Sequence, residues 1–181
     1  MKLEIFEFID KTVAMVDNMK DILEESNREL EYFFREKFLC YDNILNISSR
    51  VKTRDSLKEK IFRNNFYLLY KTPEELIENL SDLIGLRIEC RFIEDEDDVY
   101  SKVMKEFYIP VEDGYYHTED NPYIQLNLDK KQPQVQKNGF RIYKIDGRYI
   151  RKDRTIKFEL QIKSLVNVFW GEAEHKVLYK N

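Results

Sequence analysis

The stretch LIGLRIECRFI, from Leu83 to Ile93, decides the fold of this chain of 181 residues. From Leu86 onward its apolar and polar side chains alternate, which is the pattern of a β-strand with one buried and one exposed face. Helical patterns come before this stretch and mainly strand patterns come after it. The stretch therefore predicts the strand at which a helical first part of the chain passes into a sheet.

Helical periodicity marks the chain before this strand. The apolar residues Ile5, Ile9, Val13 and Val16 recur at spacings of three and four, which places them on one face of a helix. The segments predicted next are a helix at 26–40, a short strand at 47–52, a helix at 55–63, and a helix that starts at Pro73 with Thr72 as its N-cap.

The chain after residue 93 is expected to contain four strands and two helices. We expect a helix at 96–107, strands at 123–128, 139–144, 148–150 and 155–162, and a closing helix at 164–179. This order predicts an α+β fold with a mixed β-sheet of about five strands flanked by helices. Residues 1–181 are expected to form a single domain, in which 1–46 is an N-terminal helical segment and 47–180 carries the motifs.

Composition restricts the class of protein. A hydrophobic content of 43% supports a packed core, and the formal net charge of −4 makes a nucleic-acid partner unexpected, although it leaves a local basic groove open. No apolar run approaches the ~20 residues that a membrane-spanning helix needs. The two cysteines form no zinc-ligand pattern. We expect a cytoplasmic protein with no membrane partner.

The five glycines are isolated from one another, so neither a P-loop nor the dinucleotide-binding fingerprint is present in the sequence. Phosphate recognition is therefore expected from side chains or metal. A basic run offers such side chains, because Arg50 and Lys52 would share one strand face. Ser56 and Lys60 lie one helical turn apart on the next element. This array suits a polyphosphate, and a solvated charged surface is the alternative.

Two carboxylates form the second candidate site. Asp82 stands immediately before the decisive strand, and Glu159 lies within the strand predicted at 155–162. In that strand Glu159, Gln161 and Lys163 would share one face, which is natural for the wall of a site and unusual for a core. Two carboxylates on separate strands can hold Mg²⁺ together with substrate phosphates. An ordinary exposed strand face is the alternative.

Neither of the two histidines, taken alone, is good evidence for a catalytic or metal-binding site. His117 has no partner histidine with which to hold a metal, and we expect it in a loop. His175 lies in the closing helix, where a single histidine is more often a packed or surface residue than a catalytic one.

Four motifs, taken in order, resemble those of the synthetase domain of the RelA/SpoT family, whose members make the alarmones ppGpp and pppGpp. They read Arg-x-Lys-x-x-x-Ser-x-x-x-Lys, then Asp-hydrophobic-hydrophobic-Gly-hydrophobic-Arg, then Glu-x-Gln-Ile-basic-Ser/Thr, and finally Trp-Ala-x-x-Glu-His followed by Tyr-Lys. The matching residues are Arg50, Lys52, Ser56 and Lys60; Asp82, Gly85 and Arg87; Glu159, Gln161, Ile162, Lys163 and Ser164; and Trp170, Glu174, His175, Tyr179 and Lys180, with Gly171 in place of the alanine.

This resemblance implies a nucleotidyltransferase-like fold and an ATP-dependent GTP pyrophosphokinase. The 3′-hydroxyl of GDP or GTP would attack the β-phosphorus of ATP, and AMP would leave. Asp82 and Glu159 would be the catalytic residues and would hold Mg²⁺. ATP would be bound by Arg50, Lys52, Ser56, Lys60 and Arg87. The guanine nucleotide would be bound by Lys137, Asn138, Phe140, Lys144, Gln161, Lys163 and His175.

The acceptor motif departs from the family's pattern Asn-Gly-Tyr-x-Ser-x-His. Here Phe140 replaces the tyrosine, Ile142 the serine and Lys144 the histidine. Phe140 keeps an aromatic face for base stacking, worth about 1–3 kcal/mol, and a cationic Lys144 suits an acceptor phosphate. Gln136 stands where the family has a lysine, but Lys137 is adjacent to it. The choice of acceptor is therefore in question.

Two other functions remain open at this point. The altered segment from Phe140 to Lys144 also suits a catalytically impaired nucleotide-binding or regulatory module. A pyrophosphokinase acting on another acceptor, such as an adenine nucleotide or the 3′ end of tRNA, is the second alternative. Small members of the family often form tetramers, so a homo-oligomer is a further expectation from the resemblance.

Overall fold

The computed structural model describes the backbone of residues 2–135, 139, 141–152 and 154–178, and the side chains of these residues except 2, 3 and 172–178. The elements follow one another as α1 (Lys2–Asn18), α2 (Lys20–Phe38), β1 (Ile44–Val51), α3 (Arg54–Arg63), α4 (Phe66–Leu69), α5 (Pro73–Asn79), β2 (Ile84–Cys90), α6 (Glu94–Glu106), β3 (Ile109–Pro110), the 3₁₀ turn η1 (Glu112–Gly114), β4 (Tyr115–His117), β5 (Ile124–Asn127), β6 (Gln134–Val135), β7 (Arg141–Arg151), β8 (Arg154–Ser164) and α7 (Leu165–Leu178).

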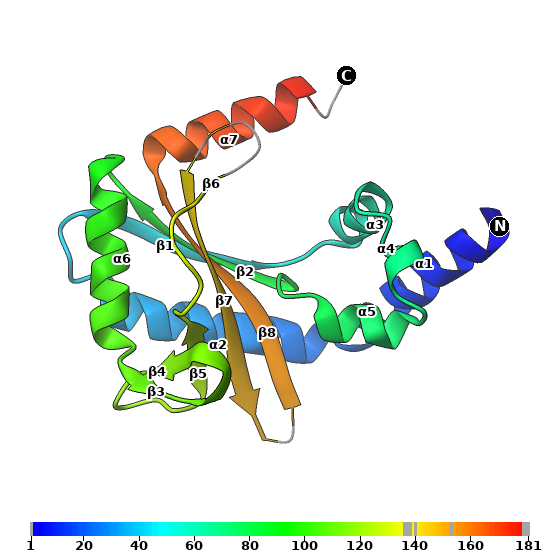
Figure 1. The fold of residues 1–181 in the computed structure, drawn as a ribbon, viewed down its shortest axis with the longest axis horizontal. Helices are drawn as coiled ribbons and strands as arrows, with labels where there is room; N and C mark the ends of the chain where they lie inside the picture. The colour runs from blue at the N-terminus through cyan, green and yellow to red at the C-terminus, as the bar shows by residue number, and fades with distance from the viewer. Residues whose placement is uncertain (1, 136–138, 140, 153, 179–181) are drawn as a thin grey trace.

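A mixed sheet organises the fold (Figure 1). Its strand order is β1-β2-β8-β7-β5-β4-β3, with β6 paired to β7. Strands β2 and β8 are parallel, and the other pairs are antiparallel. The predicted α+β fold with a mixed sheet is confirmed. The predicted number of about five strands is too low, because the described residues form eight, of which β3, β4 and β6 have only two or three residues.

Several predicted boundaries need correction. The strands predicted at 139–144 and 148–150 are one continuous strand, β7, which runs through Gly147. A Cβ atom at Gly147 would overlap the ring of Phe158 on β8, so the glycine is required by close packing and does not interrupt the strand. His117 lies in the short strand β4 and not in a loop. Helix α2 begins at Lys20, earlier than the predicted start at 26.

One face of the sheet carries the hydrophobic core. Along β2 the residues alternate between buried and partly exposed, as the decisive stretch predicts. The buried side chains pack against α2 and α6, where Leu30, Phe34 and Val103 are fully buried. Each such side chain contributes about 1.5–3 kcal/mol when it leaves water. The opposite face of β2 and β8 is consequently free to carry polar residues.

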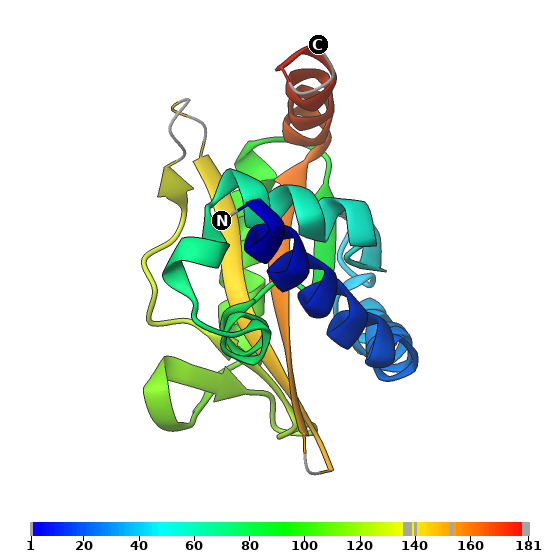
Figure 2. The ribbon, with the colours of Figure 1, turned by 90° about the vertical axis from the view of Figure 1, so that its right-hand side faces the viewer.

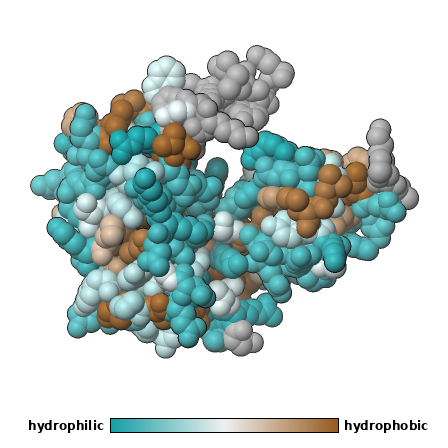
Figure 3. All heavy atoms as spheres, in the orientation of Figure 1, coloured by the Kyte–Doolittle hydropathy of each residue, from teal (hydrophilic) through white to brown (hydrophobic). Residues whose placement is uncertain are grey.

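Helices α1, α3, α4 and α5 gather beside the sheet, away from α6 and the short strands (Figures 1 and 2). The surface is hollowed between this helical group and the body of the sheet (Figure 3). Two threonines begin these helices: Thr53 Oγ1 accepts from the Ser56 N–H at 3.3 Å, and Thr72 Oγ1 accepts from the Glu75 N–H at 3.2 Å. The predicted N-cap at Thr72 is confirmed. Among the described residues, none of the helices has the length and apolar character that crossing a membrane requires.

Candidate active site

The register of the sheet brings the first group of predicted site residues into one row. Arg50 on β1 is paired with Gly85 on β2, and Gly85 is paired with Glu159 on β8. Asp146 on β7 lies opposite Glu159. Directly paired residues share a face of the sheet, so the row crosses four strands on the polar face. An arginine from near one edge and a carboxylate from the centre of the sheet therefore face the same space.

A second row lies two residues farther along the strands. Ser48 is paired with Arg87, Arg87 with Gln161, and Gln161 with Lys144. These residues stand on the same face as the first row because side chains alternate along a strand. Predicted ATP-binding and guanine-nucleotide-binding residues thus occur on adjacent strands.

Lys163 continues this face along β8, opposite Glu89. Burial is the main cause that lowers the pKa of Lys163, and the positive charge of Arg87 lowers this pKa further. Arg87 contacts Glu89 at 3.6 Å, so one of the predicted ATP-binding cations already has an acidic neighbour. An anion beside Lys163 would stabilise the charged form of its side chain.

Helix α3 adds the lysine and the serine predicted from the basic run. Lys60 Nζ lies 2.7 Å from Asp82 Oδ2, and Lys52 Nζ lies 3.0 Å from the same oxygen. Burial acts to raise the pKa of Asp82, but the hydrogen bonds and charges of the two lysines outweigh it, so this pKa is lowered. Asp82 is therefore a stable anion that ties the end of β1, the start of β2 and α3 together.

Glu159 is nearly buried and has a partner on each carboxylate oxygen. Gln161 Nε2 donates to Oε1 at 2.5 Å, and Lys144 Nζ lies 2.8 Å from Oε2 as an ion pair. Burial acts to lower the pKa of Lys144, but the charge and hydrogen bond of Glu159 outweigh it and this pKa is raised. Lys144 is thus cationic and directed at the catalytic candidate.

Two small cavities on the polar face join these residues. One, of about 90 Å³, is lined by both Asp82 and Glu159. The other, of about 130 Å³, is lined by Arg87. They share Arg50, Gly85 and Gln161. The lining of the first is completed by Val51, Lys52, Thr53 and Ser56, and that of the second by Ser48, Ser49 and Leu86. Gly85 stands in the first row, and no atom beyond its chain neighbours lies within 4 Å of a Cβ built on it, so the floor of the cleft is open at this position.

The residues present fit a metal that is held jointly with substrate phosphates. Asp82 Oδ1 is buried and has no hydrogen-bond partner among the described residues, so an oxygen ligand is available. In the part of the chain that the structure describes, no group of three or more His, Cys, Asp and Glu side chains is arranged to hold a metal ion. Mg²⁺ commonly binds through one or two carboxylates and completes its ligand shell with water and phosphate oxygens.

The predicted acceptor residues are only partly within the described structure. Lys137, Asn138 and Phe140 lie outside the described residues, and His175 lies in α7 without a described side chain. Ile142 lies two residues before Lys144 on β7 and so on the same face of the sheet, where it is 7% exposed and supplies an apolar side chain in place of the family's serine. Of the described acceptor residues, Lys144 is therefore the one whose chemistry differs most from the family pattern.

The structure adds residues that the sequence reasoning missed. Asp146 lies opposite Glu159 and is ion-paired with Lys130. The side chains of Gln132 and Gln134 bind the backbone of Lys144. Alternation along β7 was the available signal for Asp146, because it stands two residues from Lys144. No sequence signal indicates the two glutamines, which precede the strand.

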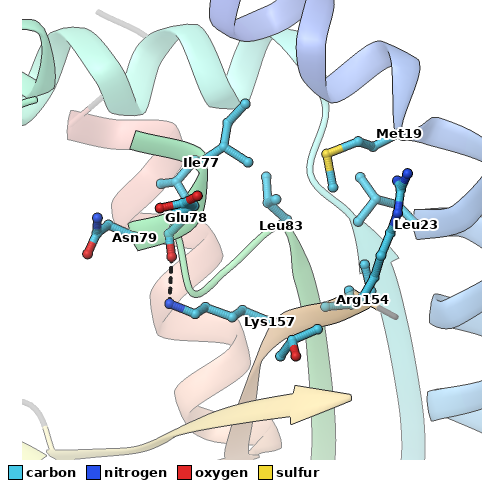
Figure 4. Close-up of a pocket in the computed structure, with 11 residues that line it drawn as sticks. Met19, Leu23, Ile77, Glu78, Asn79, Leu83, Arg154 and Lys157 are labelled. Carbon is cyan, nitrogen blue, oxygen red and sulfur yellow. Dashed lines mark hydrogen bonds between the residues drawn. The ribbon is translucent and has the colours of Figure 1, made fainter. Parts of the chain in front are cut away.

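A larger cavity of about 710 Å³ lies beside the candidate site (Figure 4). Met19, Leu23, Ile77 and Leu83 contribute apolar walls, and Lys157 crosses it to bind the Glu78 carbonyl oxygen at 2.5 Å. Neither Asp82 nor Glu159 lines it. The carboxylates and the cations meet in the smaller cleft, which is therefore the candidate active site.

Comparison with known proteins identifies the family. A family model described as the region found in RelA / SpoT proteins matches residues 49–181. Two relatives from Bacillus subtilis (strain 168) are each 27% identical: GTP pyrophosphokinase YwaC, over 95% of this chain and 83% of that protein, and GTP pyrophosphokinase YjbM, over 74% of this chain and 56% of that protein.

Solved structures share the fold. The small alarmone synthetase 1 of Bacillus subtilis, bound to its product pppGpp, superposes with a TM-score of 0.66 at 21% identity, covering 92% of this chain and 81% of that chain. A GTP pyrophosphokinase family protein from Streptococcus pneumoniae gives a TM-score of 0.59 at 24% identity, covering 99% and 79%. Because the family model spans residues 49–181, more than half of the chain, and residues of the first three motifs meet in one cleft, the chain belongs to the RelA/SpoT family.

Proposed function

We propose that this chain is a Mg²⁺-dependent GTP pyrophosphokinase, which transfers the pyrophosphoryl group of ATP to the 3′-hydroxyl of GDP or GTP and releases AMP. The observation that carries the proposal is the shared cleft. Asp82 and Glu159 line one cavity with Arg50 and Lys52, although Asp82 precedes β2 and Glu159 lies far along the sequence on β8. The family membership and the names of the two Bacillus relatives support a guanine-nucleotide acceptor.

The basic residues account for binding of ATP. Arg50 and Arg87 project from the polar face of β1 and β2, while Lys52 and Lys60 stand over Asp82. Cations that are fixed before the substrate arrives stabilise the charge that develops on phosphate oxygens without reorganising. Ser56, in the first turn of α3, lines the cavity that Asp82 and Glu159 share. The array is therefore proposed to hold the triphosphate of ATP over the polar face of β1, β2 and β8.

Asp82 and Glu159 would hold Mg²⁺ together with the phosphates of ATP. A metal bound there supplies positive charge that withdraws electron density from the phosphoryl oxygens and orients them. The free Oδ1 of Asp82 supports its assignment as a ligand. Within this arrangement, Lys52 and Lys60 hold the Asp82 carboxylate in its ionised, metal-binding form.

Glu159 is proposed to receive the proton of the acceptor hydroxyl. The acceptor's 3′-oxygen forms a bond to the β-phosphorus, the bond from that phosphorus to the α,β-bridging oxygen breaks, and AMP leaves with the bridging oxygen. The hydroxyl proton passes to the Glu159 carboxylate, which the Gln161 amide orients through its bond to Oε1. The acceptor is proposed to lie over β7 and β8, next to Lys144, Gln161 and Lys163.

A nucleotide-panel turnover assay tests the proposal. The protein is incubated with ATP and Mg²⁺ together with GDP, GTP, GMP, tRNA or no acceptor, and AMP and products are resolved by ion-exchange chromatography. We expect AMP only with GDP or GTP, together with a new ppGpp or pppGpp peak. Release of AMP with an adenine nucleotide or tRNA instead would mean that the enzyme uses a different acceptor. Binding of ATP without release of AMP would mean that the chain is a nucleotide-binding module.

A further inference from the structure

The two candidate metal ligands are unequally available. Asp82 uses one oxygen for Lys52 and Lys60 and leaves Oδ1 without a hydrogen-bond partner among the described residues. Glu159 differs in that a cation already stands at its second oxygen: Oε1 accepts a hydrogen bond from Gln161, and Oε2, although it has no hydrogen-bond partner among the described residues, lies 2.8 Å from the Lys144 ammonium. A divalent cation that needs a Glu159 oxygen must therefore displace a group of the protein itself.

Lys144 is held in place for this contact. Its backbone N–H donates to Gln132 Oε1 at 3.1 Å. Its backbone carbonyl accepts from Gln132 Nε2 at 2.7 Å and from Gln134 Nε2 at 3.0 Å. Three hydrogen bonds from outside the strand fix the main chain from which the ammonium reaches Glu159. The side chain itself is 40% exposed and has room to leave.

The ion pair between Lys144 and Glu159 occupies the oxygen at which a metal ion would bind. An ammonium group 2.8 Å from a nearly buried carboxylate oxygen supplies positive charge where a metal would otherwise supply it. A divalent cation at Oε2 would stand close to this ammonium group, and the repulsion between the two positive charges would weaken the binding of the metal. The family pattern that this chain resembles has a histidine at the position of Lys144, so this permanent charge is a property of the present chain.

We infer that Lys144 is an internal cation that neutralises Glu159 in the nucleotide-free protein and excludes a divalent metal from it until a nucleotide binds. The inference rests on the proposed function, because it takes Asp82 and Glu159 as the metal ligands. Phosphates of a bound nucleotide offer Lys144 an alternative anionic partner, and its departure opens Oε2 to the metal. Lys144 is thus a positioning residue that couples metal entry to substrate binding.

Binding of Mn²⁺ to the nucleotide-free protein tests the inference without reference to turnover. Free Mn²⁺ is measured by electron paramagnetic resonance in titrations of the wild type and of Lys144→Met, which keeps the length of the side chain and removes its charge. We expect Lys144→Met to bind Mn²⁺ at least tenfold more tightly. Lys144→Arg, which keeps the charge, should bind it like the wild type.

Two matched variants assign the effect to Glu159. Lys130→Met removes the same charge from the neighbouring pair with Asp146 and should change the Mn²⁺ affinity less than threefold. Adding Glu159→Gln to Lys144→Met should abolish the gain. Thermal unfolding of every variant confirms that the fold is kept.

Equal Mn²⁺ affinities in the wild type and Lys144→Met, or no Mn²⁺ binding by either, would overturn the inference. A gain that persists in the Lys144→Met, Glu159→Gln double variant would overturn it as well. The proposed function is judged separately by AMP release, so a protein that makes ppGpp but shows equal Mn²⁺ affinities refutes the inference alone.

Discussion

At the scale of single residues, the pairing of Asp82 with two lysines makes it the most sensitive position of the cleft. Changing Asp82 to Asn removes the negative charge that would attract a metal and leaves Lys52 and Lys60 without their anion. We expect AMP release to fall more than 100-fold, because charge stabilisation at the phosphates is lost. The turnover assay with ATP and GDP measures this, and an Asp82→Asn protein with near-normal turnover would contradict the metal assignment.

The same carboxylate predicts a dependence of stability on pH. Its pKa in the folded protein lies below the ordinary value of 3.8, so the folded state binds fewer protons than the unfolded state as the pH falls. The stabilisation by Asp82 is therefore complete above the unfolded pKa and is lost as the pH falls through the folded pKa. Urea unfolding of the wild type and of Asp82→Asn should show equal differences at about pH 7 and about pH 5, and a smaller one at about pH 3.5. A difference that is independent of pH would contradict this account.

At the scale of elements, the start of α3 links helix stability to substrate binding. Thr53 caps the helix that carries Ser56 and Lys60. We expect Thr53→Ala to cost about 1 kcal/mol of stability and to raise the KM for ATP several-fold. Thr72→Ala is the control, because it removes an equivalent cap from α5, which lies outside the two small cavities of the cleft. Equal KM values in the two variants would show that the cap acts on stability alone.

Periodicity predicted the long elements and failed on the short ones. The alternation along β2 and the start of α5 at Thr72 are confirmed because local pattern and cap chemistry determine them. Strands β3 and β6 have two residues each, too few to show any period, and pairing with neighbours alone defines them. From the sequence, Gly147 suggests that one strand ends and another begins. In the sheet the strand is continuous, and the missing side chain of Gly147 leaves room for the Phe158 ring.

At the scale of the whole molecule, a cluster of phenylalanines joins α2 to the sheet. The Phe34 ring contacts the rings of Phe38, Phe107 and Phe158 at centroid distances of 5.8, 5.9 and 6.2 Å. Changing Phe34 to Ala should lower the free energy of unfolding by about 3–5 kcal/mol, since it leaves a cavity in the core. Tyr32→Ala, on the exposed side of the same helix, should cost less than about 0.5 kcal/mol. Urea unfolding measures both, and similar losses in the two variants would contradict the assignment of the core.

The sequence indicated which residues line the cleft, but it did not indicate which of them contact each other. The order of the motifs indicated the basic run, Asp82 and Glu159 as parts of one site. The ion pair of Lys144 with Glu159 depends on how β7 and β8 are aligned, and a one-residue shift would direct Lys144 to the other face. Sequence spacing does not encode that register, because tertiary packing against the core decides it.

The central place of β8 in the sheet has a consequence for the order in which the protein forms during its synthesis. About 60 residues separate β2 from β8, the parallel strand that pairs with its edge. The synthesis of these residues takes roughly 3–12 s at ordinary translation rates. During this interval the β1–β2 pair exposes an unpaired edge to other chains. The nascent protein also carries Arg50, Lys52 and Asp82 before Glu159 exists, so the joining of the two halves of the cleft is one of the last events of folding.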